Sequence, residues 1–203
     1  MKSVISKIFT GLTVAMLASC YPAGPEYVAD IDAVLTTFEK TYDFSTKSTY
    51  AMPDQIVVDA EKDLGGSWVP EYMNPIFADP ILAQIEQNMT DNGWERVDID
   101  EDPDVVLTPA AIKSTTYFYS YWYDWWYGGY WGWYYPPYYT VSSYTTGSMI
   151  MVISSSPENS PINQGQAVWI GVANGLVTGS YDINRVKKGI DQAFTQSPYL
   201  KLN

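Results

Sequence analysis

The stretch Ser148-Met149-Ile150-Met151-Val152-Ile153 places five apolar residues in succession. An apolar run of this length between polar turns is typical of a strand that is buried on both faces. We therefore expect residues 148–153 to form a central strand. A polar turn with two prolines and a glycine follows, and then Gln166–Ala173, with apolar residues alternating around Val168, Ile170 and Val172. This second stretch is expected to be the antiparallel neighbour of the first.

Two helices are expected beside these strands. The first runs from Pro80 to Asn92, because Asp79 can cap it and proline suits a first helical turn. The second runs from Ile183 to Gln196, with Ser180 or Asp182 as its cap. Each has an apolar stripe at helical spacing, which predicts one buried face. The stripes are Ile81, Leu82, Ile85 and Met89 in the first helix, and Ile183, Val186, Ile190, Ala193 and Phe194 in the second.

Shorter stretches rich in β-branched and aromatic residues predict further strands. They are Val34–Phe38, Thr49–Met52, Gln55–Val58, Trp94–Val97 and Val105–Thr108. Residues 60–78 contain Gly65-Gly66 and two prolines, so we expect a loop there. The predicted fold is a single α+β domain over residues 30–203, with a mostly antiparallel sheet and two helices packed on one of its faces.

The amino-terminal residues 1–19 have the form of a signal peptide, with two lysines, an apolar stretch and small residues before Cys20. The apolar stretch is too short to span a bilayer of ~30 Å. Leu17-Ala18-Ser19-Cys20 resembles the bacterial lipobox, which implies that the Cys20 sulfur carries a diacylglycerol and that residues 1–19 are removed. A plain secretory signal with a coincidental cysteine is the alternative.

Residues 20–29 contain two prolines and a glycine and are expected to be a tether between the lipid and the domain. Tyr21 stands where lipoproteins retained in the inner membrane of enteric bacteria typically have aspartate, so this resemblance implies the outer membrane. No acidic run follows Cys20 closely, which favours the periplasmic face; exposure at the cell surface stays open.

Composition excludes several classes of function. The mature chain from Cys20 has nine basic and 23 acidic residues, a net charge of about −14. Nucleic acid is therefore not an expected partner, because phosphate binding requires a basic patch. The sequence has no histidine and a single cysteine, which excludes Ser-His-Asp and Cys-His triads, zinc sites and haem attachment. We expect no cofactor, no metal and no catalytic residues.

The densest acidic run is Asp98-Ile99-Asp100-Glu101-Asp102-Pro103-Asp104. Alternating carboxylates can gather around Ca²⁺, but the run lacks the central glycine and the terminal glutamate of an EF-hand. We interpret it as a solvated turn into the strand that begins at Val105. Carboxylates of this run are also the candidates for an alternative function, a glycan hydrolase that uses two carboxyl groups.

Residues 117–139 are unusual because sixteen of these 23 residues are aromatic, and Asp124 is their only charge. A domain of this size cannot bury all of them, so part of this insert must face outward. The candidate binding residues are Trp122, Trp125, Trp126, Trp131 and Trp133, as a platform for a cell-wall or surface glycan or a partner protein. The alternatives are a self-packed hairpin and self-association between copies of the chain.

The order of several short motifs is similar to a known family. After the lipobox come Tyr42-Asp43-Phe44-Ser45 with Thr49-Tyr50-Ala51-Met52, Gly93-Trp94, Asp102-Pro103-Asp104-Val105-Val106-Leu107, the aromatic insert and Val168-Trp169-Ile170-Gly171. This order resembles the bacterial envelope lipoproteins with domain of unknown function 4136. The family often has an arginine between the late tryptophan and glycine; here Ile170 stands there, so any role of that arginine does not transfer.

The resemblance implies an envelope lipoprotein and no particular reaction. Together with the residues above, it predicts a protein anchored in the outer membrane through Cys20 that acts by binding or scaffolding. A glycan-binding module that uses the aromatic insert is the more specific form of this hypothesis.

Overall fold

The computed structural model describes residues 33–62, 64, 68–112, 147–155, 167–174 and 182–202. The chain forms two compact units, Met1–Ile31 and Asp32–Asn203, and all of the described residues belong to the second. The predicted signal peptide, the tether and the aromatic insert 117–139 lie outside the described residues. Among the helices that are described, none is long and apolar enough to span a membrane.

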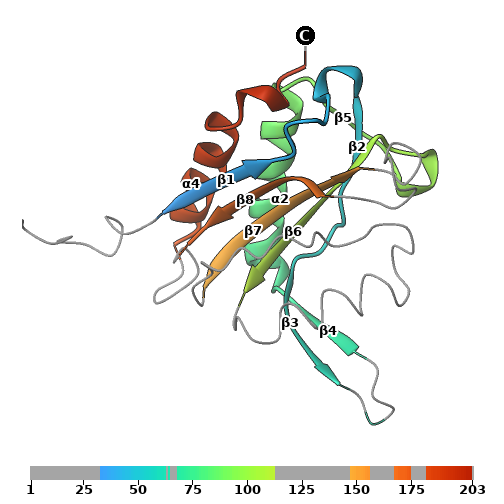
Figure 1. The fold of residues 1–203 in the computed structure, drawn as a ribbon. Helices are drawn as coiled ribbons and strands as arrows, with labels where there is room; N and C mark the ends of the chain where they lie inside the picture. Colours follow the sequence, from blue (N-terminus) through green and yellow to red (C-terminus); the bar gives the residue numbers. More distant parts are fainter. Residues whose placement is uncertain are drawn as a thin grey trace, which may run out of the picture. The chain divides into compact units, whose positions relative to one another are not determined.

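Four antiparallel strands form the main part of the sheet (Figure 1). β6 (Val105–Ile112) and β7 (Ser148–Ser155) pair from Val105 opposite Ser155 to Ile112 opposite Ser148. β8 (Ala167–Ala173) pairs with the other side of β7, and β1 (Val34–Phe38) pairs with β8. Every residue of β7 and β8 is buried, which confirms the predicted central strand and its antiparallel neighbour.

The other strands extend the sheet beyond β6. β2 (Thr49–Ala51) lies parallel to β6 on one side and parallel to β5 (Glu95–Arg96) on the other. β3 (Val57–Lys62) meets β6 in parallel at Val57 opposite Ala110, and forms a hairpin with β4 (Trp68–Tyr72). The sheet is mixed but mostly antiparallel, so the predicted α+β class is confirmed.

Two details of the prediction are wrong. Residues 60–78 are not a loop, because they contain the end of β3, all of β4 and the start of the first helix at Pro75. The helix is capped by Asn74, whose side chain accepts a hydrogen bond from the Ile76 amide at 3.0 Å. Asn74-Pro75 and Asp79-Pro80 are both a capping residue followed by proline, and the helix begins at the earlier pair. Pro80 lies inside the helix, where it lacks an N–H for one helical hydrogen bond.

Helices α2 (Pro75–Asp91) and α4 (Ile183–Thr195) cover one face of the sheet, as predicted (Figure 1). Asp182 caps α4 by accepting a hydrogen bond from the Asn184 amide at 2.9 Å. We call the apolar layer between the helices and the sheet the helix-side core. It contains the predicted stripes of both helices and sheet residues such as Leu107, Met151 and Ile153. All of these residues are buried except Ile183, which is partly buried.

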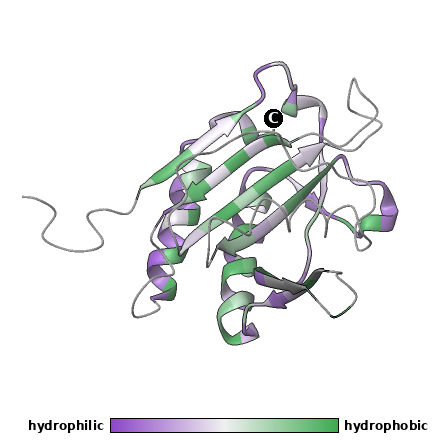
Figure 2. Ribbon diagram, turned by 60° about the horizontal axis from the view of Figure 1, so that its bottom comes forward, coloured by the Kyte–Doolittle hydropathy of each residue, from purple (hydrophilic) through white to green (hydrophobic). Residues whose placement is uncertain are grey.

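The opposite face of the sheet is also apolar and buried. Its buried cluster consists of Ile150, Val152, Ala167, Ile170 and Val172, all from β7 and β8. Val106, Thr108 and Ala110 of β6 stand opposite Ser154, Val152 and Ile150, so they point to the same side. We call these eight residues the second face, and Figure 2 shows how apolar residues follow the central strands. A bulge between Ile153 and Ser154 breaks the predicted alternation in β8 and leaves Val168 in the helix-side core.

Two buried tryptophans hold the carboxyl-terminal residues in place. The Trp94 indole donates a hydrogen bond to the Leu200 carbonyl at 2.7 Å, and the Trp169 indole donates to the Ser197 hydroxyl at 2.8 Å. The Leu202 amide donates to the Asn92 carbonyl at 2.8 Å. The 3-10 helix η5 (Pro198–Leu200) is thereby tied both to β8 and to the turn that follows α2.

Candidate functional site

Cys20 and the five candidate tryptophans, Trp122, Trp125, Trp126, Trp131 and Trp133, lie outside the described residues. The lipid anchor and the aromatic platform therefore stay predictions. The described part of the sequence adds one candidate site that the sequence reasoning did not find. It lies where the end of β2, the turn that follows it, Tyr72 of β4 and Arg96 of β5 approach the acidic run.

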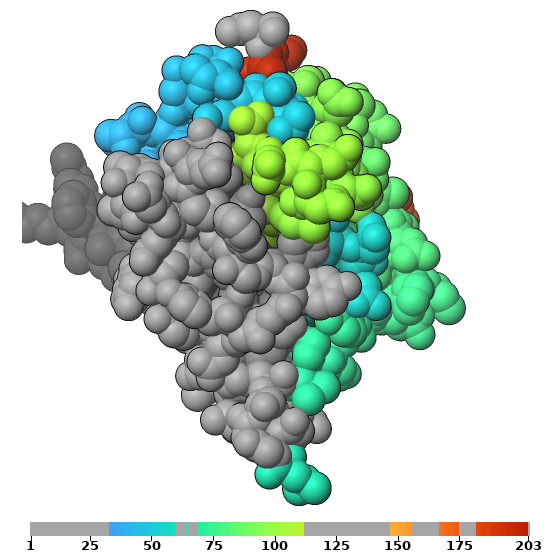
Figure 3. Space-filling view, turned by 90° about the vertical axis from the view of Figure 1, so that its right-hand side faces the viewer, coloured from blue at the N-terminus to red at the C-terminus, as the bar shows by residue number. Residues whose placement is uncertain are grey.

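The acidic run forms the turn into β6. Ile99–Glu101 is a short 3-10 helix (η3), and Asp102 takes a left-handed conformation with φ 52°. In Figure 3 this loop, in yellow-green, lies on the surface beside α2 and the residues near β2. Among the described residues, no group of three or more acidic, histidine or cysteine side chains is arranged to hold a metal ion.

Asp104, the last acid of the run, has a structural role. Its carboxylate accepts hydrogen bonds from the Ser48 amide at 2.8 Å and from the Thr49 amide at 3.0 Å. It also accepts one from the Thr49 hydroxyl at 3.1 Å. Partial burial by itself raises the pKa of Asp104, but these hydrogen bonds and the nearby charge of Lys47 outweigh it and lower the pKa. Asp104 therefore joins the start of β6 to the start of β2.

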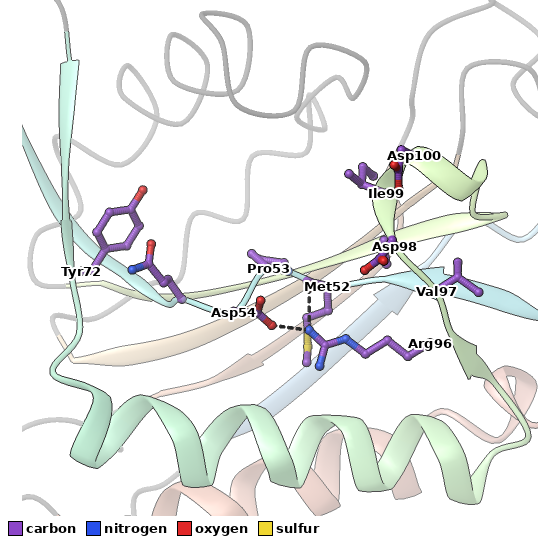
Figure 4. A pocket seen from close by; sticks show the side chains of 11 residues that line it. Met52, Pro53, Asp54, Tyr72, Arg96, Val97, Asp98, Ile99 and Asp100 are labelled. Carbon is purple, nitrogen blue, oxygen red and sulfur yellow. Dashed lines mark hydrogen bonds and ion pairs between the residues drawn. The ribbon is translucent and has the colours of Figure 1, made fainter.

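An open cleft of about 750 Å³ lies between the turn after β2 and the loop before η3. Figure 4 shows Asp54 and Arg96 in its middle, Asp98 and Asp100 at one end, and Tyr72 at the other. Among the described residues that line the cleft there are three aspartates and one arginine, so the net charge of the cleft is negative. Its volume falls within the range of ~300–1,000 Å³ that is typical of small-molecule sites.

Arg96 is the most constrained charged side chain of the cleft. Its guanidinium donates to the Met52 carbonyl at 3.0 Å and to Glu86 of α2 at 3.0 Å, and forms an ion pair with Asp54. Burial alone lowers its pKa, but the hydrogen bond with Asp54 and the charges of Glu86 and Asp54 raise it overall. Three acceptors hold Arg96, two in the turn after β2 and one in α2, so it forms a fixed wall and keeps the cleft's shape.

Tyr50 of β2 lies under this region, fully buried in the helix-side core. Its hydroxyl has no hydrogen-bond partner among the described residues. Burial, and then the charge of Glu86, raise the pKa of Tyr50 to about 12. The hydroxyl thus stays protonated at any physiological pH, which makes it unsuitable as a general base.

The cleft was missed because its parts are distant in the sequence. Arg96 lies in a strand of two residues, and its partners Asp54 and Glu86 belong to a turn and to a helix. The one available signal was that Arg96 is one of only two arginines in the chain. The described residues that line the cleft include no histidine, cysteine or lysine, and their carboxylates can accept hydrogen bonds or attract a cation.

Comparison with known proteins identifies the family. The family model of a domain of unknown function, DUF4136, matches residues 34–199. The crystal structure of a DUF4136 family protein from Bacteroides thetaiotaomicron VPI-5482 is 31% identical, with a TM-score of 0.63 over 84% of this chain and 97% of that one. The dodecamer of a PelC variant from Paraburkholderia phytofirmans is 8% identical, with a TM-score of 0.39 over 85% of this chain and 99% of that one. Among curated proteins, none matches the chain. The chain therefore belongs to the DUF4136 family.

Proposed function

We propose that this protein is a lipoprotein of the bacterial cell envelope, anchored in the outer membrane through Cys20 and facing the periplasm, and that it acts by binding or scaffolding. The observation that supports the anchor is Leu17-Ala18-Ser19-Cys20, which follows a basic and an apolar region. The described domain begins at residue 33, thirteen residues after Cys20. At ~3.3 Å per extended residue, this connection reaches at most roughly 45 Å from the lipid.

The anchor is tested by the Cys20→Ser variant. The parent should incorporate a palmitate analogue and fractionate with the outer membrane, whereas the variant should incorporate none and appear in the soluble fraction. Equal membrane association of both proteins, with no label in either, would refute the proposal. Protease treatment of intact cells then separates the two faces of the membrane: protection of the parent supports the periplasmic face, and digestion supports the cell surface.

Binding is preferred to catalysis because the described residues that line the cleft include no serine, threonine, cysteine or histidine that could serve as a nucleophile or as the usual base. The cleft's carboxylates at positions 98 and 100 lie on one loop and are exposed, whereas a glycosidase places two carboxyl groups in different environments across its substrate. A hydrolase built on the acidic run is the alternative. Turnover of cell-wall fragments that is lost in the Asp98→Asn or Asp100→Asn variant would favour it.

We place the binding surface on the five tryptophans of the insert, Trp122, Trp125, Trp126, Trp131 and Trp133, with a glycan or an envelope protein as the partner. The motivation is the number of aromatic rings beside so few charges, since aromatic faces stack on sugars and are enriched in protein interfaces. Tryptophan emission is measured while peptidoglycan fragments, polysaccharide or vesicles are added. A saturable shift that is absent from a variant with all five tryptophans changed to alanine supports this site.

The matched control is the Arg96→Gln variant, which alters the cleft and leaves the insert unchanged. If this variant loses the shift and the tryptophan variant keeps it, the cleft is the binding site and the platform hypothesis is wrong. If no ligand changes the emission of the parent, we would reject the glycan form of the proposal and cross-link the protein in intact envelopes to find a protein partner.

A further inference from the structure

β1 is the outermost strand at one end of the sheet (Figure 1). Among the described strands it pairs with β8 alone, in a register that runs without a break from Val34 opposite Ala173 to Phe38 opposite Trp169. This edge is open to solvent, because Leu35 is 46% exposed and Phe38 is 37% exposed. β1 is therefore a place where a further strand can extend the sheet.

The pairing with β8 fixes which backbone groups of β1 point outward. The Glu39 amide donates to the Val168 carbonyl at 2.9 Å, so Glu39 is one of the residues that bond β8. In an antiparallel pair such residues alternate with residues whose N–H and C=O groups point to the other side. The groups of Val34, Thr36 and Phe38 therefore point away from β8. These three residues offer donors and acceptors to a further strand.

The other outer strands of the described sheet have features that discourage such pairing. β5 has only two residues, Glu95 and Arg96, which are both charged and exposed. β4 contains Pro70, which has no N–H to donate. Short length, charges and proline are the usual protection of a sheet edge. β1, with the sequence Val-Leu-Thr-Thr-Phe, has no charge, no proline and no bulge in its register.

A second copy of β1 fits this edge because the strand is complementary to itself. When two copies run antiparallel about a two-fold axis at Thr36, Val34 of each copy stands opposite Phe38 of the other, and the two Thr36 residues face each other. This register uses all three outward-facing residues, whereas either neighbouring register uses only two. Pairs of an aromatic with a β-branched residue and pairs of threonines both stabilise antiparallel strands. No like charges meet within β1, although the chain as a whole has a net charge of −12.

We propose that two copies of the protein pair through β1, antiparallel about Thr36, so that their two sheets join into one. Each of the three facing pairs of outward residues exchanges two backbone hydrogen bonds. Val34 and Phe38 stand opposite Ala173 and Trp169 of the helix-side core, so the helices of both copies lie on the same side of the joined sheet. A self-complementary patch of this kind is what a two-fold dimer requires. The dimer depends neither on the lipid anchor nor on the aromatic insert, so these proposals can fail separately.

The contact that decides the proposal joins Val34 to Phe38. Within one chain these residues are four positions apart on a strand, roughly 13 Å, which is too far for a nuclear Overhauser contact. Full chains with Cys20→Ser are prepared with two different isotope labels and mixed at concentrations up to ~1 mM. Contacts from the Val34 methyl groups of one chain to the Phe38 ring of the other are expected. A chain that stays monomeric throughout this range, or a dimer without these contacts, would overturn the proposal.

Two lysine variants separate this register from a general effect of charge. Thr36→Lys places two like charges opposite each other on the two-fold axis, so the dissociation constant from sedimentation equilibrium should rise by about tenfold or more. Thr41→Lys, in the exposed turn after β1, changes the net charge equally. It should leave the constant within about twofold or lower it, because the acidic copies then repel each other less. Equal effects of the two variants would overturn the proposal.

Further measurements exclude unfolding and other occupants of the edge. Urea unfolding shows whether Thr36→Lys is folded, and if it is not, the contact between the labelled parent chains decides. If the dimer is lost when the five tryptophans of the insert are changed to alanine and is unaffected by Thr36→Lys, the copies associate elsewhere and the proposal is wrong. If the chain stays monomeric while cross-linking in intact envelopes joins residues 34–38 to a different protein, the edge serves that protein and the proposal is again wrong.

Discussion

The indole nitrogen of Trp169 donates a hydrogen bond to the hydroxyl oxygen of Ser197 across 2.8 Å, and both side chains are fully buried. The Tyr199 hydroxyl donates to the same oxygen at 3.1 Å. One serine oxygen therefore accepts from two aromatic residues, one in β8 and one in η5. The Tyr199 ring in turn stacks on Phe38 of β1, with centroids 3.8 Å apart. Through this group the last residues of the chain hold the edge of the sheet.

Replacing Ser197 by alanine should destabilise the domain by about 1–3 kcal/mol, because the buried Trp169 N–H then has no acceptor. Urea unfolding followed by tryptophan emission measures the loss. The control is Thr90→Ala on the exposed side of α2, for which we expect a change within about 0.5 kcal/mol. A Ser197→Ala variant as stable as the parent would show that the hydrogen bond contributes nothing.

Gly171 faces the Trp169 ring so closely that a side chain does not fit. An added Cβ would lie 2.6 and 2.9 Å from two atoms of the indole and 3.3 Å from the Met151 methyl group. Gly171→Ala should therefore cost about 1–3 kcal/mol through overpacking. The smaller ring of Trp169→Phe should absorb part of this cost, so the double variant should be more stable than the two separate losses predict. Strict additivity would contradict the steric explanation.

The lowered pKa of Asp104 predicts how stability changes with acid. A carboxyl group whose pKa is lower in the folded state stabilises the fold above its unfolded pKa, and this contribution is lost as pH falls through the folded pKa. The unfolding free energy of the parent should exceed that of Asp104→Asn at pH 7, and the difference should shrink as the solution is acidified below pH 4. Asp100→Asn, from the exposed part of the same loop, is the control. A difference in unfolding free energy that is constant with pH would contradict the lowered pKa of Asp104 in the folded state.

The raised pKa of Tyr50 predicts a change in alkaline solution. Between pH 10 and its folded pKa of about 12, the unfolded chain loses the phenolic proton while the folded chain retains it, so stability falls as pH rises. Tyr50→Phe should lower this alkaline slope. At pH 7 it should leave stability unchanged or increase it, because it removes a buried hydroxyl that no described residue bonds. A large loss at pH 7 would show that the hydroxyl has a partner in solution.

Arg96→Lys should not preserve the structure of the cleft. An ammonium group is a single point charge and cannot reach the Met52 carbonyl, Asp54 and Glu86 together, as the planar guanidinium does. We expect a loss of about 1–2 kcal/mol, mostly from the Met52 carbonyl, because exposed ion pairs contribute little. Hydrogen exchange should accelerate at residues 52–56 and not in α4. Unchanged exchange at residues 52–56 would show that Arg96 does not hold this turn.

The sequence predicts those parts of the fold that depend on local patterns. The apolar run 148–153 and the stripes of the two helices are confirmed. Burial of one face of a helix gives apolar residues at helical spacing, and burial of both faces of a strand gives a continuous apolar run. The start of α2 is not recovered, since two successive proline motifs offer equivalent caps and only tertiary packing decides between them. The β3–β4 hairpin is missed because Pro70 argues against a strand in the sequence. Among the described strands β4 pairs with β3 alone, and proline is acceptable in such an edge strand although it would exclude a central one.

The candidate cleft is less predictable than the fold. Parallel pairing of β2 with β5 and β6 brings residues from separate parts of the chain together. The periodicity of apolar residues does not reveal contacts between distant segments. The contacts of Arg96 with Met52, Asp54 and Glu86 therefore give no local pattern in the sequence. The family match likewise identifies the domain without indicating its chemistry.

The opposition of Ile112 and Ser148 also has an evolutionary consequence. Two paired strands joined by a long connection tolerate changes in its length, since doubling a flexible loop costs only about 0.6 kcal/mol of closure entropy. Insertions and deletions between these residues are therefore nearly neutral for the pairing itself. The pairing of β6 with β7 can therefore accept added residues at this site without losing its register.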